Sequence, residues 1–143
     1  MNILLITSDY PPNALWGMGW HVVKLKESLE NRGVSCYVAT AYKSRNYGNN
    51  IITTDERTDR DLLSSNKYEI FNDFDKFNLW QEKLADAVLN SNIEFDLIHC
   101  HNWMSWITAQ KIKKVKNIPI VITFHLLQKQ YELMKENPIP TFH

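Results

Sequence analysis

The chain has few cysteines and no net charge, and each of these two features excludes a class of protein. Its 143 residues include two cysteines, four glycines, and 16 acidic and 16 basic residues. Two cysteines are too few for a disulfide framework. Because Cys36 and Cys100 lie in apolar runs, we expect buried, reduced thiols. A net charge of zero gives no electrostatic basis for a nucleic-acid or anionic-membrane partner.

Long apolar runs are also missing. No run approaches the roughly 20 residues that a membrane-spanning helix needs. The first six residues carry no basic lead, so they do not read as a secretory signal. We therefore expect a cytoplasmic protein without a transmembrane segment. The hydrophobic share of 44% and the charged share of 22% are ordinary for a globular domain, and the length suffices for one domain with a core.

Strand and helix patterns alternate along the chain. Short apolar runs predict strands at 3–6, 34–40, 95–100 and 118–124, with a further short strand at 51–52. Helical spacing of apolar residues predicts helices from about residue 19 to a stop at 31–33, over 77–88, over 104–116 and over 126–136. The alternation predicts an α/β domain with a Rossmann-like, doubly wound and mainly parallel sheet.

The segment from Ser44 to Ser65 interrupts this alternation. It is polar, rich in turn residues and poor in core residues, so we expect it to be more mobile than the rest. Its charged run at 55–61 is interpreted as a solvated surface rather than a binding site.

Polar groups follow three of the predicted strands. In an open parallel sheet, ligands bind beyond the carboxyl ends of the strands. The segment Asp9–Trp20 follows the first strand, His101-Asn102-Trp103 follows a later one, and His125 follows the last. We expect these groups to converge on one crevice. Two histidines at successive strand ends, with a glycine-containing loop at a third, favour a binding site over a structural role.

Gly17-Met18-Gly19 stands just before a predicted helix. Glycines let backbone N–H groups approach an anion, and a helix N-terminus adds partial positive charge, so phosphate or pyrophosphate is the natural ligand. Val22 stands where a dinucleotide fingerprint has its third glycine, and no acidic residue follows the second strand. These departures argue against a nicotinamide-dependent dehydrogenase.

His99 and His101 have the spacing of two ligands on one face of a strand. His125 could add a third, but no carboxylate cluster accompanies them, so we predict no metal site. His99 is interpreted as a core histidine bonded to backbone. Cys100 has no evident base beside it, which argues against a nucleophilic role.

Tryptophans flank the same two loops: Trp16, Trp20, Trp103 and Trp106. Aromatic faces stack on sugar rings, so a carbohydrate site is one interpretation. Core packing is the other, and we prefer it for each tryptophan taken separately.

Three segments together resemble glycosyltransferase family 4 and the related glycogen and starch synthases. Residues 10–22 (YPPNALWGMGWHV) resemble the family's opening, where two prolines precede a Gly-Gly loop and a helix begins near a His-Val pair. Residues 95–103 (FDLIHCHNW) are similar to a strand ending in His-x-His-Asp-Trp, and residues 119–125 (PIVITFH) to a Pro-x-Val-x-Thr-x-His strand. The motifs occur in the family's order and spacing.

The resemblance implies that residues 1–143 form the N-terminal, acceptor-side domain of a two-domain GT-B enzyme. Such enzymes transfer a sugar from a nucleotide-sugar to an acceptor with retention of configuration, and they need no catalytic metal or further cofactor. Gly17, Met18 and Gly19 match the loop that meets the donor phosphate and sugar, and His125 matches a catalytic histidine near the transferred sugar. The other predicted site residues would line the cleft or contact the acceptor: Asp9, His21, His101, Asn102 and Trp103.

Two departures from the family pattern stand out. Trp16 replaces the first glycine of the loop, and these 143 residues contain no counterpart of the C-terminal nucleotide-sugar domain. We therefore expect a truncated chain that is inactive without that domain. Two other interpretations stay open: a non-catalytic module that binds carbohydrate or a partner, and an unrelated doubly wound domain such as a small hydrolase or a response-regulator-like module.

Overall fold

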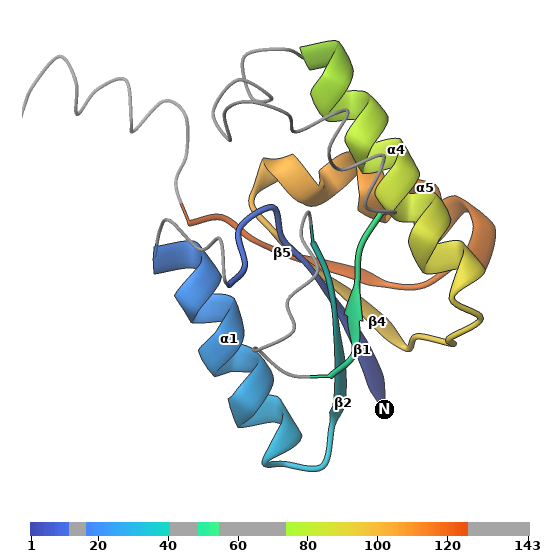
Figure 1. Ribbon diagram of the computed structural model, residues 1–143. Coiled ribbons are helices and arrows are strands. Elements are labelled where there is room, and N and C mark those ends of the chain that lie inside the picture. Colours follow the sequence, from blue (N-terminus) through green and yellow to red (C-terminus); the bar gives the residue numbers. More distant parts are fainter. Residues whose placement is uncertain (12–16, 41–48, 55–73, 126–143) are drawn as a thin grey trace, which may run out of the picture.

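A computed structural model describes residues 1–11, 17–40, 49–54 and 74–125 (Figure 1). The mobility expected of Ser44–Ser65 concerns residues that lie outside these ranges, apart from 49–54. The helix expected over 126–136 also lies outside them. The described elements follow one another along the chain as β1 (Asn2–Ile6), α1 (Gly17–Glu30), β2 (Ser35–Ala39), β3 (Ile51–Ile52), α4 (Phe74–Asn90), β4 (Leu97–His101), the 3₁₀ turn η1 (Trp103–Ser105), α5 (Trp106–Lys116) and β5 (Ile120–Thr123).

The five strands form one sheet in the order β3-β2-β1-β4-β5, and every neighbouring pair is parallel. The chain leaves β1 toward β2 and β3 on one side and returns to β4 and β5 on the other. The direction of strand order therefore switches between β1 and β4, where open α/β sheets bind their ligands. The predicted parallel sheet and the short strand at 51–52 are confirmed.

Helices cover both faces of the sheet, as Figure 1 shows for α1 on one side and α4 with α5 on the other. Successive residues of β1 divide between the two faces. Leu4 packs in a core cluster with Leu84 of α4 and Ile112 of α5, whereas Leu5 packs with Val22 of α1. Each such side chain contributes roughly 1.5–3 kcal/mol when it is fully buried. The doubly wound architecture is confirmed.

Local signals set the helix ends. Helix α1 stops at the predicted place, where Gly33 has a φ of 79° and its N–H donates to the carbonyl of Glu30. Helix α5 ends at Lys116, and Asn117 caps it with a φ of 51° and an N–H that donates to the carbonyl of Lys113. The predicted helix over 104–116 begins later than expected, because η1 occupies its first residues. Among the described helices, none is long and apolar enough to cross a bilayer.

Candidate functional site

Asn102 connects the three strand ends at which the sequence predicts a site. Its side-chain oxygen accepts a hydrogen bond from the backbone N–H of His125 at 2.7 Å, and its Nδ2 lies 3.3 Å from Sδ of Met18 in α1. Its own backbone N–H donates to the carbonyl of Thr123 at the end of β5. One buried side chain thus ties together α1, the end of β4 and the end of β5.

The backbone of Asn102 is strained. Its φ of 63° and ψ of 172° lie in a region that is nearly exclusive to glycine, at a cost on the order of 1–3 kcal/mol. The surrounding contacts hold it there, since the Ser105 hydroxyl lies 3.1 Å from the His101 carbonyl oxygen and 2.9 Å from that of Asn102. Strain of this kind is concentrated at functional sites, where a side chain must be placed at a fixed position.

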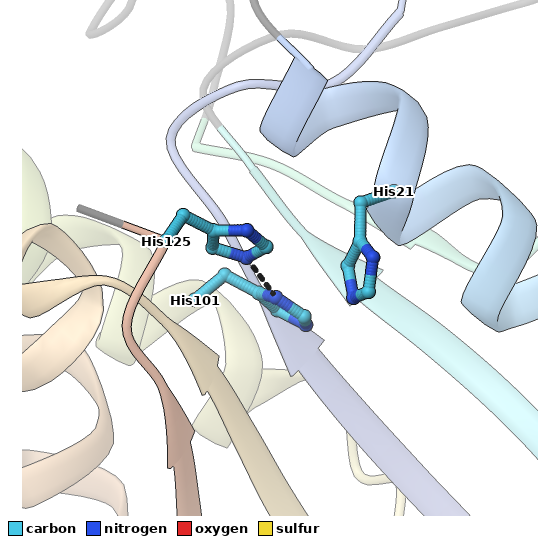
Figure 2. A group of neighbouring side chains, drawn as sticks. All are labelled: His21, His101 and His125. Atoms are coloured by element: carbon cyan, nitrogen blue, oxygen red, sulfur yellow. Dashed lines mark hydrogen bonds between the residues drawn. The ribbon is translucent and has the colours of Figure 1, made fainter.

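Three imidazoles lie together beside this asparagine. Nδ1 of His101 is 3.1 Å from Nε2 of His125, and the dashed line in Figure 2 marks this hydrogen bond. The ring of His21 reaches down from α1, with its centroid 4.9 Å from that of His125 and 5.7 Å from that of His101. His101 is fully buried, whereas His21 and His125 are exposed. The structure therefore brings three of the predicted site residues into one cluster.

Burial favours the neutral form of His101 and His125 in this cluster. Removal from water lowers the pKa of His101 to about 3, with neighbouring histidines adding to the effect. Burial also lowers the pKa values of His99 and His125. In the hydrogen bond between His101 and His125, one neutral ring therefore donates and the other accepts. Among the described residues, Nε2 of His101 finds no hydrogen-bond partner although it is buried.

His99 belongs to the same face of β4 as His101, as the spacing predicted, and the two rings stack with centroids 4.5 Å apart. The expected bond to backbone is wrong. Nε2 of His99 lies 2.8 Å from the hydroxyl oxygen of Thr123 on the neighbouring strand. His99 thus stacks on His101 and bonds to a side chain of β5, and it is not a core histidine bonded to backbone.

The glycine pair lies within α1 instead of preceding it. Gly17, Met18 and Gly19 form the first turn of the helix, and the Gly19 N–H donates to Oδ2 of Asp9 at 3.2 Å. Asp9 is 4% exposed, so this carboxylate is a buried cap of the helix and not an open surface of the cleft. A Cβ on Gly17 would meet no atom within 4 Å. The phosphate-binding role of Gly17, Met18 and Gly19 stays a prediction.

The tryptophans are mostly at the surface, so the preference for core packing is wrong for three of them. Trp20, Trp103 and Trp106 are 48%, 45% and 41% exposed, and Trp16 lies outside the described residues. The Trp103 ring packs edge-on against Phe77 of α4 at 5.8 Å. Trp103 and Trp106 line an apolar pocket of about 430 Å³ together with Phe77, Asn78, Gln81, Ile107, Ile122 and Phe124.

The cysteines fit the sequence-based expectation. Both Cys36 and Cys100 are buried free thiols. Burial raises the pKa of Cys100 to about 12, which suppresses the thiolate that a nucleophile needs.

A doubly wound parallel sheet with polar groups gathered beyond β1, β4 and β5 is a Rossmann-like domain with a candidate site at the switch in strand order. A family model, Glycosyltransferase Family 4, matches residues 16–141. The chain belongs to this family.

Curated relatives agree with the family. An uncharacterized glycosyltransferase of Methanocaldococcus jannaschii, MJ1607, is 26% identical over 133 residues, which cover 87% of this chain and 31% of the relative. A glycogen synthase of Mycobacterium tuberculosis is 22% identical over 138 residues, which cover 87% of this chain and 33% of the relative. The chain spans about a third of the length of these relatives.

Proposed function

We propose that this chain is the N-terminal, acceptor-side domain of a GT-B glycosyltransferase that transfers a sugar from a nucleotide-sugar with retention of configuration. The main support for this proposal is that one side chain, Asn102, joins the three motif segments. Its oxygen accepts a hydrogen bond from the His125 N–H, and its nitrogen contacts the sulfur of Met18. The names of the relatives, a glycosyltransferase and a glycogen synthase, support the same class of reaction.

In this proposal His125 acts on the transferred sugar. Its backbone is fixed by Asn102, and its ring is oriented by the hydrogen bond to His101. Its pKa is lowered by burial, so the ring is neutral and can accept or donate a hydrogen bond to a sugar hydroxyl. Catalysis would then rest on positioning and on stabilisation of the leaving diphosphate.

The segments that form the site contain no cation for that diphosphate. Residues 1–21, 99–110 and 118–127 include neither lysine nor arginine, and the Asp9 carboxylate already bonds the Gly19 N–H. A diphosphate carries about two negative charges, and the lack of even two charge-assisted contacts costs orders of magnitude in affinity at roughly 1.4 kcal/mol per tenfold. The missing cations are therefore assigned to a C-terminal nucleotide-sugar domain, without which the chain is inactive.

The test compares the 143-residue chain with a polypeptide that also carries the C-terminal domain. Calorimetry with UDP-glucose and ADP-glucose, and a transfer assay with both donors, would be run on each. We expect weak, unsaturated binding and no transfer for the chain alone, and transfer for the longer polypeptide. Turnover by the chain alone, at a rate comparable to that of the longer polypeptide, would contradict the two-domain proposal.

A second function is favoured by the apolar pocket. The exposed rings of Trp103 and Trp106 offer the flat surfaces on which sugars stack. A non-catalytic carbohydrate-binding module would bind oligosaccharides there and lose affinity in Trp103→Ala. It would transfer no sugar even when joined to the C-terminal domain, which separates it from the enzyme.

A further inference from the structure

Three histidines from three separate parts of the fold bring ring nitrogens close together. His21 lies in α1, His101 ends β4 and His125 follows β5, and one ligand nitrogen from each lies within 4.8 Å of the others. Figure 2 shows the three rings facing one another. We call this group the histidine trio. Among the described residues, the histidine trio is the one group of three or more His, Cys, Asp or Glu side chains that is close enough to hold a metal ion.

The distances suit a tetrahedral metal ion. At zinc–nitrogen distances of about 2.0–2.1 Å, two ligands of a tetrahedral ion lie roughly 3.3–3.4 Å apart. Nδ1 of His101 and Nε2 of His125 are already 3.1 Å apart, so their separation needs to change little. His21 is exposed, and a surface side chain changes rotamer within nanoseconds, which allows its nitrogen to move the remaining distance.

A second observation concerns the buried ring of His101. Nε2 of His101 is buried without a partner among the described residues, although buried polar atoms in native structures are nearly always paired. The His101 ring therefore has an unused nitrogen in addition to the Nδ1 atom that faces His125.

The chemistry of the ligands selects the class of ion. Three imidazoles without a carboxylate suit zinc, cobalt, nickel or copper, whereas magnesium and calcium prefer oxygen ligands. Three protein ligands also leave a fourth position open, as in sites that hold a water molecule or a small ligand.

We propose that His21, His101 and His125 form a three-histidine site for one divalent transition-metal ion, with its fourth position open. This differs from the sequence-based prediction of no metal. That prediction paired His99 with His101, considered His125 as a third ligand and found no carboxylate cluster beside them. In the structure His99 bonds to Thr123, and His21 lies beside His101 and His125 instead. The site is argued without the proposed sugar transfer, and a bound ion would replace the hydrogen bond between His101 and His125 on which that proposal draws.

The test titrates the 143-residue chain, freed of metal with EDTA and then dialysed, with zinc chloride and with cobalt chloride. We expect one ion per chain with a dissociation constant in the micromolar range or below. Bound cobalt should show the intense visible absorption of a tetrahedral site. Magnesium chloride should give no binding.

Two variants and a matched control locate the ion. His21→Ala and His125→Ala each remove an exposed ligand, so both should fold and both should weaken zinc binding by at least about tenfold. His143→Ala removes a histidine outside the trio and should leave the affinity unchanged. Circular dichroism would verify folding. Absence of binding at tens of micromolar zinc, or an affinity that neither trio variant lowers, would overturn the site. So would an affinity that His143→Ala lowers equally. Because no sugar donor is used, this result is independent of the transfer assay.

Discussion

The two faces of the sheet differ in the side chains they carry beside β4. One face is apolar, and the other carries histidines. On the face covered by α4 and α5, Ile98 and Cys100 join a large apolar cluster. On the opposite face, His99 and His101 stack on each other and meet polar side chains. The apolar cluster on that face gathers over β1 and β2, beneath α1. Alternation along β4 thus places apolar core residues on one face and the histidines of the candidate site on the other.

The largest expected effect on stability lies on the α4/α5 face. Leu84 is fully buried in the apolar cluster, so Leu84→Ala should lower the free energy of unfolding by about 2–5 kcal/mol through lost burial and a cavity. The matched change on the other face, His21→Ala at an exposed position, should alter it by no more than about 0.5 kcal/mol. Urea denaturation of both variants measures this. Equal losses would contradict the division between the two faces.

The histidine face should make stability depend on pH. His101 has a pKa of about 3 in the folded chain against an ordinary value of 6.5, so the unfolded chain takes up its proton first as the pH falls. The free energy of unfolding should therefore be highest above pH 6.5, and it should decrease as the pH is lowered from 6.5 to 3. At pH 5 the loss relative to pH 8 is on the order of 2 kcal/mol.

Urea denaturation in EDTA across this pH range measures the effect. His101→Gln should reduce the slope, because glutamine does not titrate. A wild-type chain whose stability is the same at pH 5 and pH 8 would show that His101 is not held neutral.

A smaller effect is expected at the edge of the site, where Asp9 caps α1. Asp9→Ala leaves the Gly19 N–H without its acceptor and should cost about 1–2 kcal/mol. Asp9→Asn keeps an acceptor oxygen and should cost less, so the difference between the two variants isolates the hydrogen-bond acceptor. The loss in Asp9→Asn relative to the wild-type chain measures the contribution of the charge. Thermal unfolding of both gives the comparison. Two variants as stable as the wild-type chain would exclude the cap as a stabilising contact.

The sequence predicts the elements that rest on local patterns. Apolar runs with a period of two or 3.6 residues predict the parallel sheet and its helices, and Gly33 marks the end of α1. The convergence of His101 and His125 follows from the rule that parallel strands end at one edge of a sheet. These predictions succeed because each depends on a short stretch of chain or on one general property of the fold.

The remaining features depend on contacts between distant segments. His21 joins the cluster only through the way α1 packs, and the bond of His99 to Thr123 depends on the register of β4 with β5. The exposure of Trp103 carries no local signal, because tryptophan is common both in cores and at binding surfaces. Spacing along the chain could not reveal these three placements.

The most direct test of the central claim is His125→Ala in the polypeptide that includes the C-terminal domain. Sugar transfer and the free energy of unfolding would be measured on the same preparations. Because His125 is exposed, we expect its loss to change stability by less than about 1 kcal/mol. We expect kcat/KM to fall at least about 100-fold, which corresponds to roughly 2.7 kcal/mol of transition-state stabilisation. An unchanged kcat/KM, or a fall in activity matched by an equal loss of folded protein, would contradict the assignment of this site.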